Sequence, residues 1–270
     1  MPYLNEKVIW VTGASSGIGE ALALELSTLK GVKLILSSRR KEELERVKGN
    51  CSPSVQSNIK ILPLDLSQAD TLKLTVEAAI QFFGHIDVLI NNGGISQRSL
   101  AKETSIQVDR QIMEVDYFGT VALTKFLLPH FLKRRGGHFV TVSSVMGLIG
   151  TPYRSGYAAA KHALHGFFDS LRAELWKESK SFHVTLICPG WIRTNVTLNA
   201  LTGDGSKLNV MDKTTDRGLS PKVCAQRIIQ AIQGKKEEVY IGRMKEVSGV
   251  YLKRFFPRLF SKAVRKIAVR

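Results

Sequence analysis

Short apolar runs alternate with amphipathic stretches along most of the chain. The runs are continuously apolar, which is typical of strands buried on both faces of a parallel sheet. Between them, apolar residues recur at offsets of three and four, the period of a helix. This order predicts a doubly wound α/β fold, with about seven parallel strands, helices on both faces, and ligands at the carboxyl ends of the strands. The predicted strands span 7–13, 33–38, 59–65, 86–92, 137–144, 182–190 and 238–242, and the predicted helices span 17–30, 40–48, 68–83, 105–134, 154–179 and 220–233.

Two segments depart from this order. Residues 190–219 carry no clear period, and loops of that length are usually functional or disordered. From Arg243 to Arg270 the chain has nine Lys or Arg and one acidic residue, Glu246, a net of +8 in a chain whose total is +16. No repeat or low-complexity linker divides the rest. We therefore predict one domain over residues 1–243 and a basic amphipathic helical extension over residues 244–270.

The concentration of positive charge in the extension suggests an anionic partner. A basic amphipathic helix can lie in the interface of an anionic membrane. Its apolar face can equally pack on the chain's own pocket or on a second subunit. We expect no nucleic-acid partner, because only the net charge favours one.

The cysteines and the apolar segments bear on compartment. Cys51, Cys188 and Cys224 have neither a metal-like nor a redox-pair spacing, so we expect no metal and a reducing environment. Val8 already begins the first strand, which leaves no room for a signal peptide, and no window approaches the roughly 18 apolar residues of a spanning helix. We expect a cytoplasmic protein, with peripheral membrane contact as an option.

A glycine cluster follows the first predicted strand. Gly13, Gly17 and Gly19 permit a tight turn and the close approach of a diphosphate to a helix N-terminus. The second strand ends in SSRR, residues 37–40, where an NAD-binding protein would carry an acid for the ribose hydroxyls. Arginine suits a 2′-phosphate instead. The sequence therefore predicts NADP(H).

A second cluster carries acid–base chemistry. Tyr157 and Lys161 are spaced i and i+4, on one face of a helix. Tyrosine alone, with a reference pKa of about 10, is a poor catalyst near neutrality, but a neighbouring cation favours the phenolate. Ser144, at the end of the strand before this helix, is placed to donate a hydrogen bond to a substrate carbonyl. Together these residues predict proton transfer to or from a substrate oxygen.

These features together resemble the short-chain dehydrogenase/reductase family over roughly residues 7–242. The shared motifs are T-G-x3-G-x-G at 12–19, Asp65 in LDLS, NNGG at 91–94, the Ser144, Tyr157 and Lys161 set, and P-G-x3-T at 189–194. Longer phrases such as YFGTVALTK and SGYAAAKHALHGFFDSLRAE are most similar to the dehydrogenase/reductase member 7B branch. That branch includes membrane-associated enzymes with an N-terminal anchor.

The resemblance implies roles for these positions. Tyr157 exchanges a proton with the substrate oxygen, Lys161 holds the nicotinamide ribose and assists the phenol, and Ser144 polarises the carbonyl. Residues 1–243 would then form a dinucleotide-binding and catalytic domain. The chain would self-associate through the helices at 105–134 and 154–179, as a homodimer or homotetramer. The residues expected to bind the cofactor are Gly13, Ser15, Ser16, Gly17, Ile18, Gly19, Ser38, Arg39, Arg40, Asp65, Leu66, Asn91, Gly93, Tyr157, Lys161, Pro189, Gly190, Ile192 and Thr194.

Asp116 is out of place in the pattern, because it falls inside the apolar stripe of the helix at 105–134. A buried, unpaired carboxylate is costly. The family carries a catalytic asparagine at this position, which in relatives acts largely through its backbone carbonyl in a proton relay. We expect Asp116 to act in the same way. The alternatives are that its carboxylate partners Lys161, or that the substitution has no mechanistic meaning.

We expect the substrate pocket to be bounded by residues 95–98, 145–149, Tyr153 and 190–219. This wall is mostly apolar and favours a hydrophobic or lipid-like substrate, while Arg98, Arg154 or Arg193 is a candidate for an acidic head group. The favoured function is NADP(H)-dependent interconversion of a ketone and a secondary alcohol. The alternatives are reduction of 3-oxoacyl thioesters on an acidic carrier protein, and a catalytically weak dinucleotide-binding sensor or scaffold.

Overall fold

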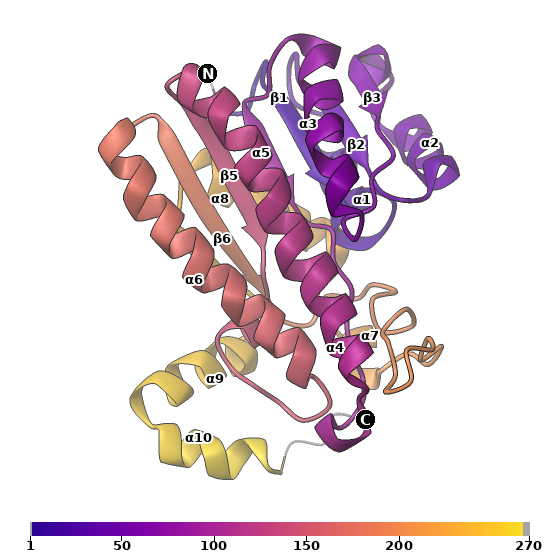
Figure 1. The fold of residues 1–270 in the computed structure, drawn as a ribbon, viewed down its shortest axis with the longest axis vertical. Coiled ribbons are helices and arrows are strands. Elements are labelled where there is room, and N and C mark those ends of the chain that lie inside the picture. The colour runs from indigo at the N-terminus through magenta and orange to yellow at the C-terminus, as the bar shows by residue number, and fades with distance from the viewer. Residues whose placement is uncertain (1, 267–270) are drawn as a thin grey trace.

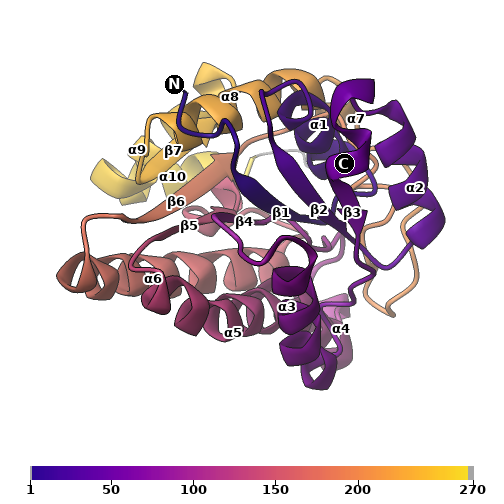
Figure 2. The ribbon, with the colours of Figure 1, turned by 90° about the horizontal axis from the view of Figure 1, so that it is seen from above.

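The computed structural model describes residues 2–266 and is built around one parallel sheet. Seven strands follow the order β3-β2-β1-β4-β5-β6-β7, so the strands are added toward one edge of the sheet as far as β3 and toward the other edge from β4 onward (Figure 1 and Figure 2). This confirms the predicted doubly wound fold. The strands are β1 (Val8–Thr12), β2 (Lys33–Ser37), β3 (Ile59–Ile61), β4 (Val88–Asn91), β5 (Gly137–Val142), β6 (Phe182–Pro189) and β7 (Glu238–Ile241).

Helices cover both faces of the sheet, as Figure 2 shows. One face carries α1 (Gly17–Leu26), α2 (Lys41–Asn50) and α8 (Pro221–Gln233), and the other carries α3 (Ala69–Phe83), α5 (Gly119–Lys133) and α6 (Ser155–Glu178). Each face has its own apolar core. The central strands are buried on both sides, which explains why apolar residues fall on both of their faces.

Two predicted elements are shorter than expected. Strand β3 ends at Ile61 rather than 65, although the backbone N–H groups of Leu62 and Leu64 still donate to the Leu36 and Ser38 carbonyls, each at 3.0 Å. Pro63 is tolerated between them because β3 is an edge strand. Helix α1 ends at Leu26 rather than 30, where the Ser27 hydroxyl donates to the Leu24 carbonyl at 2.7 Å and so satisfies one of the helix's last acceptors. Three short 3₁₀ turns, Pro53–Asn58, Ala101–Glu103 and Val145–Gly147, complete the connections in this part of the chain.

The predicted helix at 105–134 is interrupted by a wider turn. α4 (Ile106–Met113) and α5 are joined by a π-helical turn over Glu114–Phe118, which contains Asp116. A π turn shifts the side chains after it around the helix axis, and such turns are frequent at functional sites. The apolar period alone could not indicate this change of pitch.

Residues 190–219 fold over the carboxyl end of the sheet. They are mostly irregular, as predicted, and contain one short helix, α7 (Lys213–Asp216). Isolated parallel bridges pair Ile192 with Leu219 and Gln97 with Leu201. The segment is therefore fastened both to itself and to the loop that follows β4.

The C-terminal residues form α9 (Met244–Phe255) and α10 (Pro257–Val264), drawn in yellow in Figure 1. Pro257 begins α10, where its missing N–H costs nothing. Val250 of α9 and Phe260 of α10 pack against the 145–149 segment and Tyr157. Residues 267–270 of the predicted extension lie outside the described part of the chain, and the division into domain and extension stays a prediction. Among residues 2–266, no helix has the length and apolar character needed to cross a membrane.

Candidate active site

The glycine turn after β1 leaves the N-terminus of α1 accessible. Gly13 and Gly17 have φ of +64° and +61°, in the left-handed region that favours glycine. A Cβ at Gly13 would lie 2.8 Å from the Gly93 Cα, and one at Gly19 would collide with the Gly13 carbonyl oxygen. The turn therefore excludes side chains where a diphosphate would approach the helix.

A cavity of about 480 Å³ adjoins this turn. Thr194, from the segment after β6, lies over Gly17, so that a Cβ on this glycine would be 3.1 Å from the Thr194 Cγ2. An open glycine turn and a polar, basic cavity at the topological switch point fit a dinucleotide. The residues that line the cavity are Ser16, Gly17, Glu20, Ala21, Leu24, Arg40, Glu43, Arg46, Arg193, Thr194, Asn195, Asn199, Pro221 and Lys222.

The ends of β2 and β3 lie beside this turn. Arg39 and Arg40 are exposed, and Arg40 donates to the Ser15 hydroxyl at 3.3 Å, which places one guanidinium at the edge of the glycine turn. The Asp65 Oδ1 accepts from the backbone N–H and the hydroxyl of Ser67, so this carboxylate orders its own turn. Ser38 is half-buried and Leu66 is buried.

Strand β4 is fastened to β1 by hydrogen bonds at its carboxyl end. The Thr12 hydroxyl accepts from the backbone N–H groups of Asn92 and Gly93, each at 3.0 Å. The Asn91 amide donates to Thr124 at 3.1 Å and to Thr141 at 3.4 Å, while its buried oxygen has no hydrogen-bond partner within residues 2–266. That spare acceptor is a second feature that fits a polar ligand at this edge.

Tyr157, Lys161 and Asp116 form a chain from a half-buried tyrosine to two buried charged residues. Tyr157 and Lys161 lie one turn apart on α6, with the lysine Nζ 5.6 Å from the centroid of the tyrosine ring. The same Nζ lies 3.3 Å from the Asp116 Oδ2 and donates to the Val142 carbonyl at 3.4 Å. The Asp116 Oδ1 accepts from the Ile95 backbone N–H at 2.7 Å. The carboxylate thus contacts Lys161, one of the alternatives that the sequence left open.

Burial and charge compete in this pair. Burial alone would lower the pKa of Lys161, but the Asp116 carboxylate and Tyr157 raise it above its ordinary value. Burial raises the pKa of Asp116, against the opposing effects of the Lys161 ammonium and the Ile95 N–H. The lysine therefore stays an ammonium at neutral pH because the aspartate accompanies it into the core.

Ser144 lies at the end of β5 and caps the turn that follows. Its hydroxyl accepts from the Met146 backbone N–H at 3.1 Å and donates to the Pro189 carbonyl at 3.3 Å. The next residue, Val145, belongs to the small apolar cluster on which Tyr157 packs. Gly190 and Ile192 continue from Pro189, with Ile192 buried, and bring the end of β6 to the same side of the sheet.

Two residues of the predicted pocket wall have roles that the sequence did not indicate. Gln97 is fully buried, and its Oε1 accepts from the backbone N–H groups of Gly156 and Tyr157 at 2.8 and 3.3 Å. It therefore satisfies the first turn of the helix that carries the tyrosine. Asp212 is paired with Arg98 and Arg154. Neither residue belongs to a local motif, since each acts on partners distant in the sequence.

His165, Cys188 and Glu238 lie together beneath this region. The His165 imidazole has the Cys188 sulfur 3.7 Å from Nε2 and a Glu238 oxygen 3.8 Å from Nδ1. One ligand-type atom of each residue lies within 4.8 Å of those of the other two, so the three side chains form a single cluster. Burial is the main cause that raises the pKa of the Cys188 thiol. Cys188 is also inaccessible to solvent, so it is no candidate nucleophile.

Comparison with known proteins agrees with this geometry. The family model described as short chain dehydrogenase matches residues 7–204. Dehydrogenase/reductase SDR family member 7B of Bos taurus is 44% identical over 263 residues, which are 96% of this chain and 80% of that protein. The chain therefore belongs to the short-chain dehydrogenase/reductase family, whose members are oxidoreductases.

Solved structures of the same class show the same fold. A short-chain dehydrogenase/reductase from Burkholderia phymatum, in complex with NAD, superposes with a TM-score of 0.83 at 21% identity and covers 96% of each chain. A short-chain dehydrogenase from Burkholderia cenocepacia, in complex with NADP, gives 0.78 at 22% identity and covers 97% of this chain and 98% of its own.

Proposed function

We propose that this protein is an NADP(H)-dependent oxidoreductase that interconverts a ketone and a secondary alcohol on a hydrophobic substrate. The observation that carries the proposal is the chain from the half-buried Tyr157 to the buried Lys161 and Asp116, in a fold whose glycine turn after β1 is suited to a dinucleotide. A phenol backed by an ammonium is an acid–base pair for a carbonyl oxygen. Its place at the carboxyl ends of parallel strands is where such folds bind their ligands.

In the reducing direction, a nicotinamide cofactor held at the glycine turn of Gly13, Gly17 and Gly19 would supply the hydride for the carbonyl carbon. Tyr157 gives its phenolic proton to the carbonyl oxygen, and the Lys161 ammonium stabilises the phenolate that remains. Ser144 donates a hydrogen bond to the same oxygen as negative charge develops on it. In the free protein this hydroxyl makes a 3.3 Å hydrogen bond to Pro189, long enough for exchange with a substrate oxygen to cost little.

The preference for NADP(H) is proposed from the end of β2. Arg39 and Arg40 are both exposed there, and Arg40 already contacts the glycine turn through Ser15. A guanidinium pairs well with the 2′-phosphate. Relatives of this fold bind either nicotinamide cofactor, as the two Burkholderia proteins show, so this choice depends on the residues of this chain.

A cofactor titration tests the preference. Wild type should bind NADPH much more tightly than NADH, and Arg39→Ala should lose about tenfold or more in NADPH affinity, since hydrogen bonds to charged groups contribute about 1.5–3 kcal/mol. Arg110→Ala, which removes an exposed arginine from α4, is the control. Equal affinities of wild type for the two cofactors would refute the assignment.

A substrate screen tests the reaction. We expect NADPH-dependent reduction of hydrophobic ketones, and Tyr157→Phe should lower kcat by at least about 100-fold while cofactor affinity is unchanged, because only the proton donor is removed. Activity confined to acyl thioesters on an acidic carrier would favour the carrier-protein alternative. Tight cofactor binding without turnover on any carbonyl would favour a sensor.

We also propose that α9 and α10 hold the protein at an anionic membrane surface. Phe255, Phe256 and Leu259 are 68%, 59% and 56% exposed, and basic residues flank them along both helices. This outer face is distinct from the inner one, where Val250 and Phe260 pack on the domain. Exposed aromatic side chains among cations suit the interface of an anionic bilayer.

A further inference from the structure

Two buried arginines share one carboxylate beside the catalytic tyrosine. The Asp212 Oδ2 lies 3.3 Å from an Arg154 nitrogen and 3.7 Å from an Arg98 nitrogen. The three side chains are 5%, 3% and 10% exposed, in that order. Arg154 lies three residues before Tyr157, at the N-terminus of α6.

The carboxylate cannot neutralise both cations. Its other oxygen, Oδ1, accepts from the backbone N–H groups of Thr214 and Thr215 at 2.7 and 3.3 Å and so caps α7. Burial lowers the pKa of Arg98, and it lowers that of Arg154 to about 10. Arginine stays protonated in proteins, so both guanidiniums are charged at neutral pH. The cluster therefore holds two positive charges against one negative charge. A buried excess of charge is costly unless a ligand completes it.

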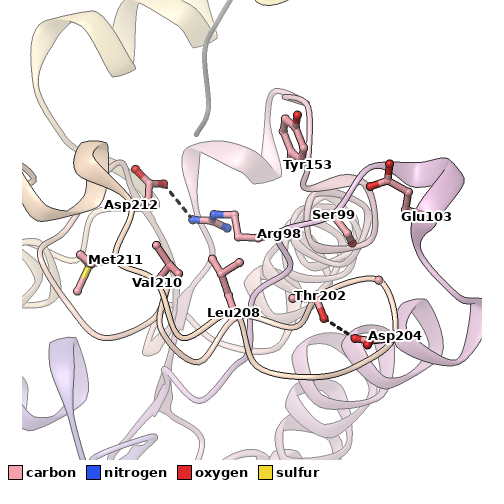
Figure 3. Close-up of a pocket in the computed structure, with 11 residues that line it drawn as sticks. Arg98, Ser99, Glu103, Tyr153, Thr202, Asp204, Leu208, Val210, Met211 and Asp212 are labelled. Atoms are coloured by element: carbon pink, nitrogen blue, oxygen red, sulfur yellow. Dashed lines mark hydrogen bonds and ion pairs between the residues drawn. The ribbon is translucent and has the colours of Figure 1, made fainter.

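Arg98 and Asp212 also line a cavity of about 600 Å³ (Figure 3). Leu208, Val210 and Met211 form an apolar part of its wall. The other acidic residues of the cavity, Glu103 and Asp204, lie on the side away from Asp212. Asp204 lies in an exposed turn, where its carboxylate accepts hydrogen bonds from the Thr202 hydroxyl and the Ser206 N–H. An anion entering this cavity is repelled at the rim and attracted to the inner end, which Arg98 provides.

We propose that this cavity binds the anionic head of the substrate, a carboxylate or a phosphate ester, at Arg98, with the apolar part of the substrate against Leu208, Val210 and Met211. The assignment of the anion to the substrate rests on the proposed reaction at Tyr157. The net charge of the cluster matches a singly charged carboxylate better than a doubly charged phosphate. Arg154 and Asp212 position Arg98, and the anion completes the charge balance.

Binding of non-reducible ligands tests the cavity without turnover. Calorimetry on the full-length protein, alone and with NADP, should show decanoate binding about tenfold or more tightly than decanol, because a charge-assisted hydrogen bond replaces a neutral one. Decyl phosphate, measured in parallel, distinguishes the two head groups: tighter binding than decanoate would assign the site to phosphate. Equal affinities for decanoate and decanol would overturn the proposal.

Variants separate binding of the anion from a purely structural role of Arg98. Arg98→Gln should abolish the preference for decanoate and leave decanol affinity within about twofold, whereas Arg98→Lys should retain part of the preference, since it keeps the charge but not the fork of donors. Arg110→Gln is the matched control. Equal loss for both ligands in Arg98→Gln, with a lowered melting temperature, would show that the arginine only holds the loop. Reduction of neutral ketones without any anion preference would refute this inference and leave the proposed reaction intact.

Discussion

Replacing Asp116 with asparagine isolates the charge of the carboxylate from its shape. In the wild type, the Asp116 Oδ1 accepts a hydrogen bond from the Ile95 N–H at 2.7 Å. The Oδ1 of an asparagine can accept the same hydrogen bond. The atom facing Lys161 becomes a neutral amide, so the Nζ contact at 3.3 Å is no longer an ion pair. Because Asp116 is fully buried, solvent cannot replace the missing charge.

The geometry sets the size of the effect. Two unit charges 3.3 Å apart attract by about 5 kcal/mol at an effective dielectric constant of about 20. The desolvation of the carboxylate, which is several kcal/mol, offsets much of this. Removing one member of a buried ion pair typically lowers the free energy of unfolding by about 3–5 kcal/mol. Because Asp116→Asn keeps the hydrogen bond to Ile95, we expect a loss near the lower end, about 3 kcal/mol.

The pH dependence of kcat follows from the sign of the Lys161 shift. Burial lowers the pKa of Lys161, and the Asp116 carboxylate is the main cause that raises it above its ordinary value. In Asp116→Asn the lysine pKa falls, so the ammonium is lost at a lower pH. The alkaline limb of the rate of carbonyl reduction should therefore move to lower pH, and near neutrality kcat should fall by more than tenfold, or about 1.4 kcal/mol of barrier.

The assay compares pH–rate profiles and denaturant unfolding of both proteins. Asp169→Asn is the matched control, since it removes an exposed carboxylate from an ion pair with Arg172 on α6. Profiles of Asp116→Asn and wild type that coincide, with kcat within tenfold, would refute a role for the carboxylate. They would support action through the backbone, as the sequence led us to expect.

Three further predictions concern the exposed face of α9 and α10, self-association of the chain, and the hydrogen bonds of Gln97 to the start of α6. The double variant Phe255→Ser, Leu259→Ser should bind anionic vesicles at least about tenfold more weakly, because burial of each apolar side chain in the membrane contributes roughly 1.5–3 kcal/mol. The control Leu74→Ser, which removes a comparably exposed side chain from α3, should leave vesicle binding unchanged. Absence of vesicle binding by the wild type would refute the membrane proposal. Light scattering should show a dimer or tetramer that Phe126→Lys on α5 weakens, and a monomer at micromolar concentration would contradict self-association. Gln97→Ala should lower the melting temperature and kcat together, since it frees two buried N–H groups at the start of α6, whereas unchanged kcat would show that the cap does not position the tyrosine.

Much of the fold could be predicted because its signals are local. The strand at 182–190 carries apolar residues on both of its faces, with His183 and Thr185 as its polar side chains. Apolar residues on both faces distinguish a sheet covered on both sides from one with a solvent face. The glycine turn is equally local, since positive φ at Gly13 and Gly17 is a demand of the turn itself. The pairing of Tyr157 with Lys161 follows from helical spacing.

The rest depends on contacts between distant segments. The π turn that contains Asp116 changes the helix pitch without changing the apolar residues around it, so periodicity cannot detect it. Asp212 lies in a segment without period, and nothing near it in the sequence indicates that two arginines, 58 and 114 residues earlier, share its carboxylate. The sequence of the C-terminal extension is compatible both with packing on the domain and with membrane contact. In the structure, α9 and α10 have an inner face that packs on the domain and an outer face that is exposed.

Two buried cationic groups approach Tyr157 from different elements, and each comes with its own carboxylate. Lys161 is matched one to one by Asp116, so this pair adds a dipole rather than a net charge. The arginine cluster is not matched, because Asp212 serves two guanidiniums and a helix cap. The uncompensated positive charge therefore lies beside the cavity lined by Arg98 and Asp212, which we propose for the substrate, while the charge of Lys161 is balanced. In such a site, binding of an anionic head group and stabilisation of the charge on the carbonyl oxygen fall to separate cations. The arginine cluster can hold the head group, while Lys161 stabilises the negative charge that develops during hydride transfer.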